Sequence, residues 1–390
     1  MRLLFVADGR SPIARNWIRY FAERGDEVYL ASTFACDVDF PLKRLDIVPV
    51  AFSALKKNSG PSRPVSSKAL GLRTRLREWF GPLTIFRASR KLRALIEEIN
   101  PDLIHAMRIP YEGMMAADAY IGAPLIVSVW GNDFTLHAPS TPMMRHYTDW
   151  TLKVTDALHA DCNRDIRLAH KWGLKVGKPT LVVPGSGGIR TDMFYPPELP
   201  TTEPIVVNPR GFRSYVCNEA FFKSIPLVLA ERAEARFICS SMAGESQAIQ
   251  WMKELGIEHA VRLNPPVPYT EMAKIFRAAQ VVVSPSMHDG TPNSLIEGMA
   301  CGCFPIAGDL ESIREWIIDG QNGLLVDPTD PQSIAKGVLL SLERKDMRRV
   351  AAGLNTKIIS ARAEYTQCMK RVEKFYESVI KAHAQPKREK

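Results

Sequence analysis

The sequence predicts an α/β protein with two doubly wound, Rossmann-like domains. Short apolar runs alternate with helical patterns along both halves of the chain, which is typical of parallel sheets covered by helices. The length of 390 residues allows two such domains with ample buried core. Residues 196–202, PPELPTT, are stiff and polar, and they give the best candidate for the linker.

Four apolar runs in the first half are expected to be buried strands. A helical pattern through Arg24 follows the first run, and an Asn-Pro turn at residues 100–101 precedes the third. Ligands of such sheets bind at the carboxyl ends of the strands, so the residues after each run are candidates for a site. The runs are Arg2–Ala7, Val28–Ala31, the residues leading to His105, and Pro124–Val129.

The second half repeats this alternation. Helical stretches separate its short apolar strands, and a further helical pattern, Tyr365–Ile380, comes near the end of the chain. These patterns set the predicted domains at residues 1–195 and 201–364, followed by a helix at 365–385. The predicted strands are Pro204–Asn208, Arg236–Cys239, Val261–Leu263 and Gln280–Ser284.

Composition narrows the class of protein. Hydrophobic residues make up 46% and charged residues 24%, which is ordinary for a globular protein. The apolar run at the N-terminus is too short for a secretion signal, and no run approaches the roughly 18 residues of a membrane span. The seven cysteines and eight histidines lack metal-ligand spacing. We therefore expect a cytoplasmic protein, in solution or on a membrane face, without a structural metal.

Positive charge is concentrated in one stretch. Between Lys56 and Leu95 there are eleven basic residues and one acid, Glu78. Within residues 68–93, Leu76, Trp79 and Phe80 recur at helical spacing among arginines. Such a basic amphipathic helix suits an anionic membrane surface. The alternative is an ordinary helix that packs its apolar side on the domain, and nucleic acid is not expected because no binding module accompanies the charge.

The stretch Ser284–Asp327 contains the most informative pattern. An apolar run ends in SPS, and the HDG turn then leads to a helix with Thr291 as the expected N-cap and Pro292 as its first residue. The amides and the dipole at a helix start favour phosphate. Asp289 before the helix and Glu297 inside it can therefore face one ligand. Gly308 is expected to open a second helix, which carries Glu311 and Glu315.

This stretch resembles the nucleotide-sugar site of the retaining glycosyltransferases of family 4, within the glycosyl transferases group 1. The carboxylate spacing, the ACG after the helix and the later DGQNGLLVDPTD match in order. The likeness is close over roughly residues 201–345 and looser in the first half. It implies the GT-B architecture, in which two Rossmann-like domains enclose a cleft and the last helix packs back on the first domain.

The resemblance also implies which cations meet the leaving diphosphate. In the loop NPRGFRSYVCNEAFFK, Arg210 matches the family arginine. Cys217-Asn218-Glu219 stands where the family has its lysine and glycine, so that lysine is missing. Arg213 is the candidate for the second cation, because a guanidinium can hold phosphate in two contacts. The alternative is that Arg213 is an ordinary surface arginine.

The donor residues follow from the same likeness. Glu297 matches the glutamate that accepts hydrogen bonds from the ribose hydroxyls, a role that suits a carboxylate. Asp289 stands where the family has its first glutamate, near the donor sugar. Its shorter side chain implies a different donor choice, a different sugar orientation or a weaker site at this position. The further donor-binding candidates are His288, Gly290 and the backbone of Asn293, Ser294 and Leu295.

In the first domain the likeness is weaker. Gly9 after the first strand would let a phosphate approach closely. Arg10 and Arg15 contact an anionic acceptor or lie at a solvated helix start. Trp130 replaces the family histidine, and Asp133 is the matching site residue. His105 is expected to be structural, and Asp37-Val38-Asp39 is expected to be a polar turn without metal. Phe194 in the loop 185–194 is expected in the core.

We therefore expect a retaining glycosyltransferase of the hexosyl-transfer type that uses a nucleotide-sugar donor. Its acceptor would be a glycan or a lipid-linked sugar, in surface polysaccharide, lipopolysaccharide or glycolipid assembly. No cofactor is expected, since the nucleotide sugar is a substrate. The alternatives are a nucleotide-sugar epimerase of the same fold and a degenerate chain that binds a nucleotide sugar without turnover.

Overall fold

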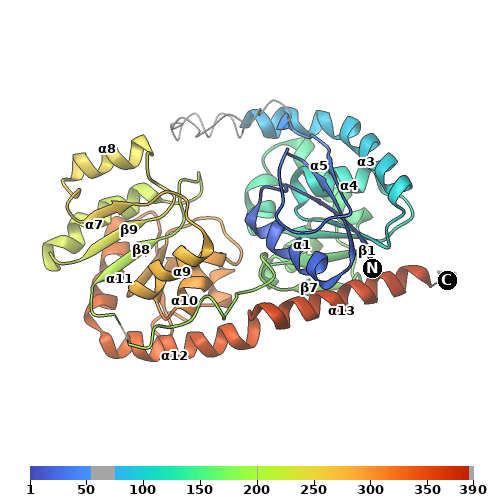
Figure 1. The fold of residues 1–390 in the computed structure, drawn as a ribbon. Coiled ribbons are helices and arrows are strands. Elements are labelled where there is room, and N and C mark those ends of the chain that lie inside the picture. The colour runs from blue at the N-terminus through green and yellow to red at the C-terminus, as the bar shows by residue number, and fades with distance from the viewer. Residues whose placement is uncertain (54–74, 200, 386–390) are drawn as a thin grey trace. The chain divides into compact units, whose positions relative to one another are not determined.

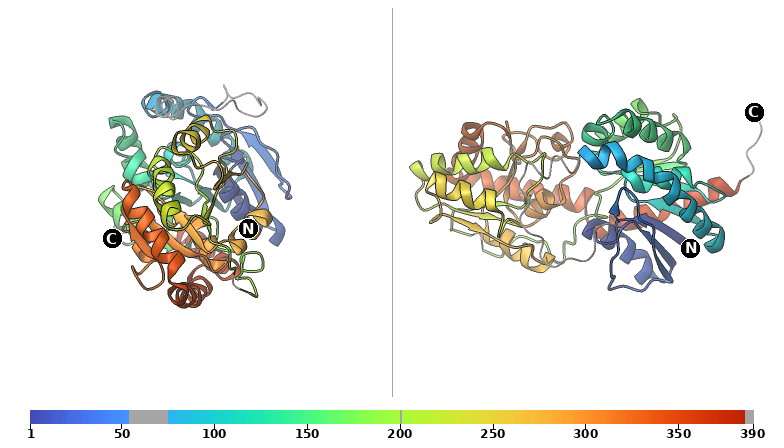
Figure 2. Two further views of the ribbon diagram at one scale, coloured as in Figure 1. Left: turned by 90° about the vertical axis from the view of Figure 1, so that its left-hand side faces the viewer. Right: turned by 90° about the horizontal axis from the view of Figure 1, so that it is seen from above.

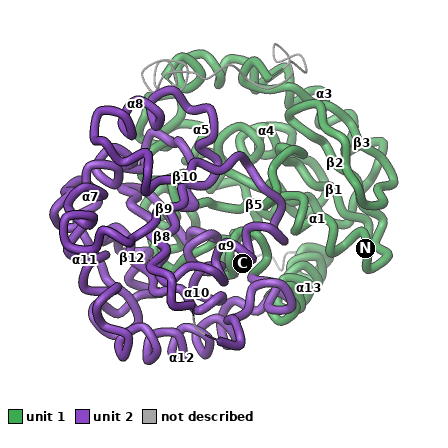
Figure 3. The backbone as a smooth tube through the Cα atoms, turned by 60° about the vertical axis from the view of Figure 1, so that its left-hand side comes forward, with its two compact units in different colours: residues 1–60, 73–188, 366–390 green, residues 61–72, 189–365 purple. Residues whose placement is uncertain are grey.

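The structure is a computed structural model that describes residues 1–53, 75–199 and 201–385. These residues divide into two compact units (Figure 3). Unit 1 contains the described residues 1–53, 75–188 and 366–385, and unit 2 contains 189–199 and 201–365. Each unit is built on its own parallel sheet with helices around it. The predicted fold class, α/β with two Rossmann-like units, is therefore confirmed.

Unit 1 has a seven-stranded sheet in the order β3-β2-β1-β4-β5-β6-β7 (Figure 1). All neighbouring strands are parallel, so their carboxyl ends lie along one edge. The strands are β1 (Arg2–Ala7), β2 (Glu27–Ser32), β3 (Arg44–Ile47), β4 (Leu103–Ala106), β5 (Leu125–Val129), β6 (Ala157–Ala160) and β7 (Thr180–Val182). The helices are α1 (Pro12–Arg24), α3 (Ile85–Ile99), α4 (Met114–Asp118), α5 (Pro142–Val154), α6 (Asn163–Lys171) and α13 (Tyr365–Ala384), with short turns η2 (Gly81–Thr84), η3 (Ile109–Gly113) and η4 (Asp133–His137).

Unit 2 has a six-stranded sheet in the order β10-β9-β8-β11-β12-β13, again parallel throughout. Figure 2 shows its helices from two further sides. The strands are β8 (Ile205–Asn208), β9 (Arg236–Cys239), β10 (Val261–Leu263), β11 (Val281–Ser284), β12 (Phe304–Gly308) and β13 (Leu324–Val326). The helices are α7 (Asn218–Glu231), α8 (Ser246–Leu255), α9 (Tyr269–Ala278), α10 (Asn293–Ala300), η5 (Ile313–Glu315), α11 (Pro331–Glu343) and α12 (Lys345–Arg362).

Helix α1 shows how the sequence sets the ends of an element. Ser11 caps its start by accepting a hydrogen bond from the Ala14 N–H, and Pro12 occupies the first turn. Gly25 ends the helix in the left-handed conformation, with φ of 95°. Trp17, buried in the middle, faces the sheet. The helix predicted through Arg24 is therefore confirmed, and it ends at that residue.

Alternation along the strands of unit 2 builds two separate layers of core. Val281 and Val283 of β11 belong to the core under α7, α8 and α11, whereas Val282 belongs to the core under α9 and α10. Successive side chains of a strand point to opposite faces, so one apolar run serves both layers. Gly298 lets α10 pack closely on β11, because a Cβ at this position would lie 3.0 Å from the Val282 side chain.

The C-terminal helix α13 packs on unit 1, as the resemblance implied for this helix. Met369, Val372 and Tyr376 are fully or almost fully buried. The Tyr376 ring stacks on Phe21, and its hydroxyl accepts a 2.9 Å hydrogen bond from the Trp17 indole. Arg371 adds a 2.9 Å bond to the Val182 carbonyl. Among the helices that the structure describes, none has the length and apolar character needed to cross a membrane.

The boundary between the units lies upstream of the predicted linker. Unit 2 begins at Ile189, whose N–H donates to the Ala363 carbonyl at 2.6 Å and whose carbonyl accepts from the Tyr365 N–H at 2.9 Å. Phe194 is buried in the core of unit 2, as expected for this side chain. Residues 189–195 therefore belong to unit 2 and not to the domain at 1–195, because these backbone bonds and Phe194 attach them there.

Two local expectations need correction. Gly308 ends β12 instead of opening a helix, and only the short turn η5 follows, at Ile313–Glu315. A Cβ at Gly308 would lie 2.3 Å from the Ser286 carbonyl, so the glycine permits a close approach of two loops. The helix α10 begins at Asn293, with Pro292 in the cap position and no side-chain cap. Thr291 is not the cap, because its hydroxyl accepts from the Trp316 indole at 2.9 Å.

Candidate functional site

The candidate site lies at the carboxyl ends of β8 and β11, which are neighbours in the sheet of unit 2. One loop leaves β8 and reaches α7, and the other leaves β11 and reaches α10. In open parallel sheets, ligands bind in the crevice outside these strand ends. The topology therefore brings together Arg210 and Asp289, which stand far apart in the sequence.

Arg210 and Asp289 form an ion pair at this position. The Arg210 guanidinium donates to an Asp289 carboxylate oxygen at 2.6 Å and to the Ser294 hydroxyl at 3.3 Å. The two charged side chains are only 11% and 14% exposed. The Nε of Arg210 is buried and has no hydrogen-bond partner among the described residues. The guanidinium is thus held in place while one of its donors remains unused.

The backbone around Arg210 is ordered by two asparagines. The Asn208 side chain accepts from the Arg210 N–H at 3.0 Å and donates to Asn218 at 3.2 Å. Asn218 donates in turn to the Gly211 carbonyl at 2.9 Å. Gly211 has φ of 63°, in the left-handed region that glycine adopts without strain. The Arg210 loop is therefore a fixed turn.

Glu297 in α10 is a buried carboxylate, only 7% exposed. Burial raises its pKa to about 7, and the positive charge of Arg210 works in the opposite direction. No hydrogen bond from the described residues reaches this carboxylate, although buried polar groups ordinarily have partners. A ligand with hydroxyl donors would satisfy it, as the predicted ribose contact requires.

The other predicted donor residues lie around the start of α10. Gly290 is buried, and His288, Asn293 and Ser294 are half-buried. The Leu295 side chain is in the core, and its N–H already donates to the Pro292 carbonyl at 2.9 Å. That amide is therefore used inside the helix. His288, Gly290, Asn293 and Ser294 remain predicted donor-binding residues.

Two residues that sequence reasoning missed hold the Asp289 loop. The Ser312 hydroxyl donates to the Asp289 carbonyl at 2.6 Å, and the Trp316 indole donates to Thr291. Both side chains are buried. They lie in the segment that was predicted to be a helix carrying Glu311 and Glu315. Nothing in the spacing of the sequence indicates these two contacts.

Arg213 lies apart from the contacts that order Arg210. It is exposed and lines a pocket of about 440 Å³ together with Lys223, Cys217 and Trp251. Cys217 sits directly before α7, and its N–H donates to the Pro285 carbonyl at 2.7 Å. Lys223 pairs with Glu219 at 2.6 Å. The second cation for a diphosphate thus remains a prediction at Arg213.

Gly9 in unit 1 is required by local packing. A Cβ at this position would lie 2.4 Å from the Cys36 sulfur and 2.9 Å from the Ser32 hydroxyl. The Gly9 N–H donates to that hydroxyl at 3.0 Å. Arg10 pairs with Asp8 at 2.8 Å, and Arg15 pairs with Asp39. These pairs fit the solvated helix start better than a site for an anion.

Asp133 is buried and orders the turn after β5. One carboxylate oxygen accepts from the Arg108 guanidinium at 2.8 Å, and the other accepts from the Trp130 N–H at 3.0 Å. Arg108 also donates to Asn132 at 2.8 Å. Asp133 therefore fixes the position of Trp130, whose indole N–H is buried without a partner in the described residues.

His105 belongs to a buried hydrogen-bond chain. Its Nδ1 bonds the Tyr376 hydroxyl at 2.5 Å, and its Nε2 bonds the Ser128 hydroxyl at 2.7 Å. Ser128 also bonds His159, whose other nitrogen bonds the Val183 carbonyl. Burial lowers the pKa of His105 well below its usual value and that of His159 to about 4. The chain ties β4, β5, β6 and the residue after β7 to α13, so the structural interpretation of His105 agrees with its surroundings.

Two groups of acidic side chains have the ligand types of a metal site. Asp39 of the D-x-D motif bonds Arg15 and Arg19, which hold the pKa of its carboxyl well below the usual range. Within the described residues, Asp161, Cys162 and Asp165 also lie close together. Arg164 contacts Asp165 at 2.8 Å, so a guanidinium already balances charge in this buried group.

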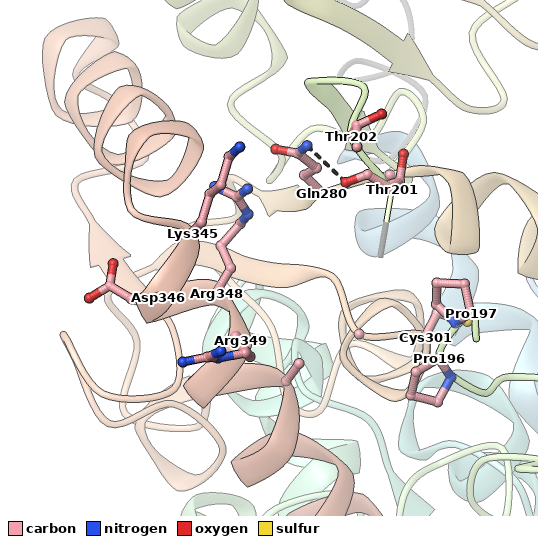
Figure 4. Close-up of a pocket in the computed structure, with 13 residues that line it drawn as sticks. Pro196, Pro197, Thr201, Thr202, Gln280, Cys301, Lys345, Asp346, Arg348 and Arg349 are labelled. Atoms are coloured by element: carbon pink, nitrogen blue, oxygen red, sulfur yellow. Dashed lines mark hydrogen bonds between the residues drawn. The ribbon is translucent and has the colours of Figure 1, made fainter. Parts of the chain in front are cut away.

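A larger pocket of unit 2, about 520 Å³, lies at the other end of α10 (Figure 4). Cys301 and Gly302 follow that helix, and the basic residues Lys345, Arg348 and Arg349 come from α12. Pro196 and Pro197 line it as well. None of the predicted site residues lines this pocket, so its size does not identify the site.

Two glycosyltransferase families match the chain. Residues 217–344 match the family described as "Glycosyl transferases group 1", and residues 2–161 match "Glycosyl transferase 4-like". A D-inositol 3-phosphate glycosyltransferase from Corynebacterium kroppenstedtii is 32% identical over 129 residues, which cover 33% of this chain and 28% of the relative. Another from Thermobispora bispora is 31% identical over 144 residues, covering 34% and 33%. The aligned segments span no more than 33% of these two relatives.

Solved structures extend the likeness in fold to nearly the whole chain. A sucrose-phosphate synthase from Thermosynechococcus elongatus superposes with a TM-score of 0.75 at 16% identity, covering 98% of this chain and 100% of that one. HepE from Anabaena, in complex with UDP and glucose, gives 0.71 at 14% identity, covering 97% and 100%. At such identities the likeness concerns the fold. It shows the GT-B fold, and two separate segments of the chain, residues 2–161 and 217–344, are similar to glycosyltransferase families.

Proposed function

We propose that this protein is a retaining glycosyltransferase of family 4 that takes a sugar from a nucleotide donor at the Arg210 site. The observation that supports this most is the buried Glu297 carboxylate beside an ordered arginine at a helix start. A buried carboxylate without a donor is costly unless a ligand completes its hydrogen bonds. The hydroxyls of a ribose are suitable donors.

The leaving diphosphate would meet Arg210. Negative charge grows on the phosphate as the anomeric bond breaks, and a fixed cation in a partly buried site stabilises that charge without reorganising. Arg210 is fixed by Asp289 and Ser294, and its Nε remains as a donor. The amides at the start of α10 would add their dipoles. Arg213 is proposed as the second cation, reached when its loop contacts the ligand.

Asp289 has two roles in this proposal. It orients Arg210 through the ion pair, and it lies near the position expected for the donor sugar. Its carboxylate is shorter than the family glutamate by one methylene, so it depends on the fixed loop for its placement. Ser312 and Trp316 hold this loop through their hydrogen bonds to Asp289 and Thr291. The leaving phosphate itself would take the acceptor proton, so this mechanism needs no protein base. Arginine and the helix amides would neutralise the diphosphate, so it needs no metal ion.

The proposed acceptor is a glycan or a lipid-linked sugar, in the assembly of surface polysaccharide, lipopolysaccharide or glycolipid. Asp133 would act on the acceptor side by holding Trp130 in place. The related fold that holds UDP makes UDP-glucose the first donor to test. A cytoplasmic protein on the inner face of the cell membrane would meet a lipid-linked acceptor.

Turnover assays of the purified protein test this proposal. UDP-, GDP- and ADP-sugars are incubated with acceptor extracts, with and without EDTA, and the anomeric configuration of any product is read by NMR. The proposal predicts retained configuration and activity in EDTA. Glu297→Gln should abolish donor binding, whereas the exposed control Glu258→Gln should not. Interconversion of the donor without acceptor would indicate an epimerase, and binding without any product would indicate a degenerate chain.

A further inference from the structure

The helical residues 75–80, the turn η2 and the start of α3 form one segment of unit 1, whose course can be followed in Figure 1. This segment presents an exposed apolar surface. Large apolar side chains there are half or more exposed, although such residues are ordinarily buried. They recur at helical spacing on one side of a continuous segment, which we call the Trp79 surface. Its members are Leu76 (50%), Trp79 (57%), Phe80 (50%), Leu83 (63%) and Phe86 (62%).

The opposite side of this segment packs on the rest of unit 1 and forms hydrogen bonds with it. The Tyr111 hydroxyl donates to the Arg77 carbonyl at 2.8 Å, and Glu78 pairs with His137 at 2.9 Å. A Cβ on Gly81 would lie 2.7 Å from the Tyr111 ring, so the segment packs closely there. Glu78 and Gly81 are buried. The outward direction of the apolar side is therefore set by contacts on the other side.

For the described part of the basic stretch, this arrangement differs from an ordinary helix that packs its apolar side on the domain. An ordinary amphipathic helix would bury Trp79 and Phe80 against the domain and expose Glu78. The structure has the reverse, with the acid inside and the aromatic rings outside. Residues 68–74 of the predicted stretch lie outside the described residues.

Cations surround the apolar side chains. Arg75 precedes them, and Arg87 and Arg90 follow on the exposed side of α3, where the Arg90 guanidinium lies 5.0 Å from the Phe86 ring. Lys91 and Arg93 are exposed on the next turn. The one acid of residues 75–93, Glu78, is buried against His137. The exposed side therefore combines aromatic rings with positive charge.

We propose that the Trp79 surface docks on an anionic lipid bilayer. Its aromatic and leucine side chains would enter the interface between head groups and acyl chains, and the arginines would contact lipid phosphates. The positive charge around the surface complements the negative charge of anionic lipids. Five exposed apolar side chains are unfavourable in water, and the bilayer interface would cover them. The docking itself does not depend on the proposed function. Only its biological role, which is to bring the enzyme to a lipid-linked acceptor, rests on that function.

The contacts with Tyr111 and His137 locate the Trp79 surface relative to the strands of unit 1. Tyr111 lies in η3, which follows the carboxyl end of β4, and His137 lies in η4, which follows that of β5. The bilayer would therefore lie against the loops at the strand edge where the acceptor is expected. A lipid-linked acceptor could then reach unit 1 with its lipid still in the bilayer.

Vesicle co-sedimentation of the full chain tests the proposal. Wild type should bind vesicles of phosphatidylcholine with phosphatidylglycerol, bind phosphatidylcholine alone weakly, and be released by salt. Trp79→Ala with Phe80→Ala should lower binding by at least about tenfold. The matched control Trp150→Ala, an exposed tryptophan on α5, should leave it unchanged. Thermal melting of each variant checks that exposed positions have been changed without unfolding.

A charge test separates electrostatics from insertion. Arg87→Glu with Arg90→Glu should lower binding to anionic vesicles by about tenfold or more, whereas Lys171→Glu with Lys175→Glu should not. Trp79→Phe should keep binding but remove most of the blue shift in tryptophan fluorescence that vesicles induce. Glu297→Gln should bind vesicles normally, so failure of the donor site and failure of docking are distinguishable.

Several results would overturn the proposal. Equal binding by the wild type and the Trp79/Phe80 variant would remove this surface from docking. Equal binding to neutral and anionic vesicles would remove the charge argument. A dimer in light scattering that dissociates in the same variant, without vesicle binding, would assign the surface to a second copy of the chain.

Discussion

The guanidinium of Arg210 donates a 2.6 Å hydrogen bond to the carboxylate of Asp289, 79 residues further along the chain. The pair joins the loops that leave two neighbouring parallel strands, β8 and β11. Because both side chains are nearly buried, the ion pair sets the direction of the cation before any ligand arrives. The pair therefore links the fold of unit 2 directly to the chemistry proposed for it.

Replacing Arg210 should affect turnover more than donor binding. Arg210→Ala removes the fixed cation, and we expect kcat to fall by about 10²–10³-fold because the charge on the leaving diphosphate loses its stabilisation. Arg210→Lys should recover only part of this, since an ammonium cannot reproduce the fork that meets Asp289 and Ser294. Steady-state kinetics with the identified donor measure the change. An unchanged kcat in Arg210→Ala would remove this residue from the mechanism.

Donor affinity should rise with pH up to about 7. The pKa of Glu297 is raised to about 7, and ribose hydroxyls donate to the ionised carboxylate. Affinity should therefore increase by up to about tenfold per pH unit below this pKa and level off above it. Calorimetric titration with a nucleotide sugar is suitable, because its diphosphate does not titrate in this range. A flat affinity profile from pH 5.5 to 8, as estimated from that pKa, would contradict the assignment.

Glu297→Gln should stabilise the unliganded protein at alkaline pH. The raised pKa means that the folded state holds more protons than the unfolded state between 4.5 and about 7, so stability falls as pH rises through this window. Above it the wild type has the full cost of a buried carboxylate, about 1–3 kcal/mol, which the amide avoids. Urea unfolding of both proteins at pH 6 and 8, chosen roughly on each side of that pKa, measures the difference. A larger difference at the lower pH would reverse the expected sign.

Acid should destabilise unit 1 through its buried histidines. The folded pKa of His159 is about 4 and that of His105 is lower than usual as well, against 6.5 when exposed. The unfolded state therefore binds more protons below pH 6.5, and stability is lost as pH falls from there to about 4. The slope should reach about 1.4 kcal/mol per pH unit for each histidine. A stability that does not change over this window would contradict the neutral, buried state of both rings.

Tyr376→Phe should weaken the attachment of α13. The hydroxyl accepts from Trp17 and bonds His105, and its loss leaves two buried nitrogens without their partner. We expect a loss of about 1–3 kcal/mol in the free energy of unfolding. Tyr365→Phe, at the first position of the same helix, is a control that leaves these bonds intact. Equal stability of the Tyr376 variant and wild type would show that water replaces the hydroxyl.

The sequence predicted strands that show a short apolar run and missed strands that lack one. Continuous apolar runs such as β1 and β11 stand out because parallel strands are covered by helices on each side. The strand Arg44–Ile47 is half-buried at a sheet edge, and Ala157–Ala160 contains a histidine, so neither shows an apolar run. Such strands exist because their neighbours offer a ladder of hydrogen bonds, which local sequence does not reveal.

The same distinction applies to the candidate site. Arg210, Asp289 and Glu297 follow strand ends, so the topology predicts that they converge. The supporting bonds from Ser312 and Trp316 depend on a side-chain packing that no spacing encodes. The predicted cap at Thr291 was wrong for this reason, because the Trp316 indole uses the threonine hydroxyl. Arg213 remains a prediction, since an exposed loop side chain is placed by its ligand.

The most direct test is thermal-shift measurement with UDP, GDP, ADP and their sugars in EDTA, on wild type, Glu297→Ala and the exposed control Glu258→Ala. A ligand at a hundred times its dissociation constant should add about 2.7 kcal/mol to the free energy of unfolding. We predict that one nucleotide class stabilises wild type and the control and leaves Glu297→Ala unchanged. Stabilisation of Glu297→Ala equal to that of wild type, or no stabilisation of wild type by any of these nucleotides, would contradict a nucleotide-sugar site at Arg210 and Glu297.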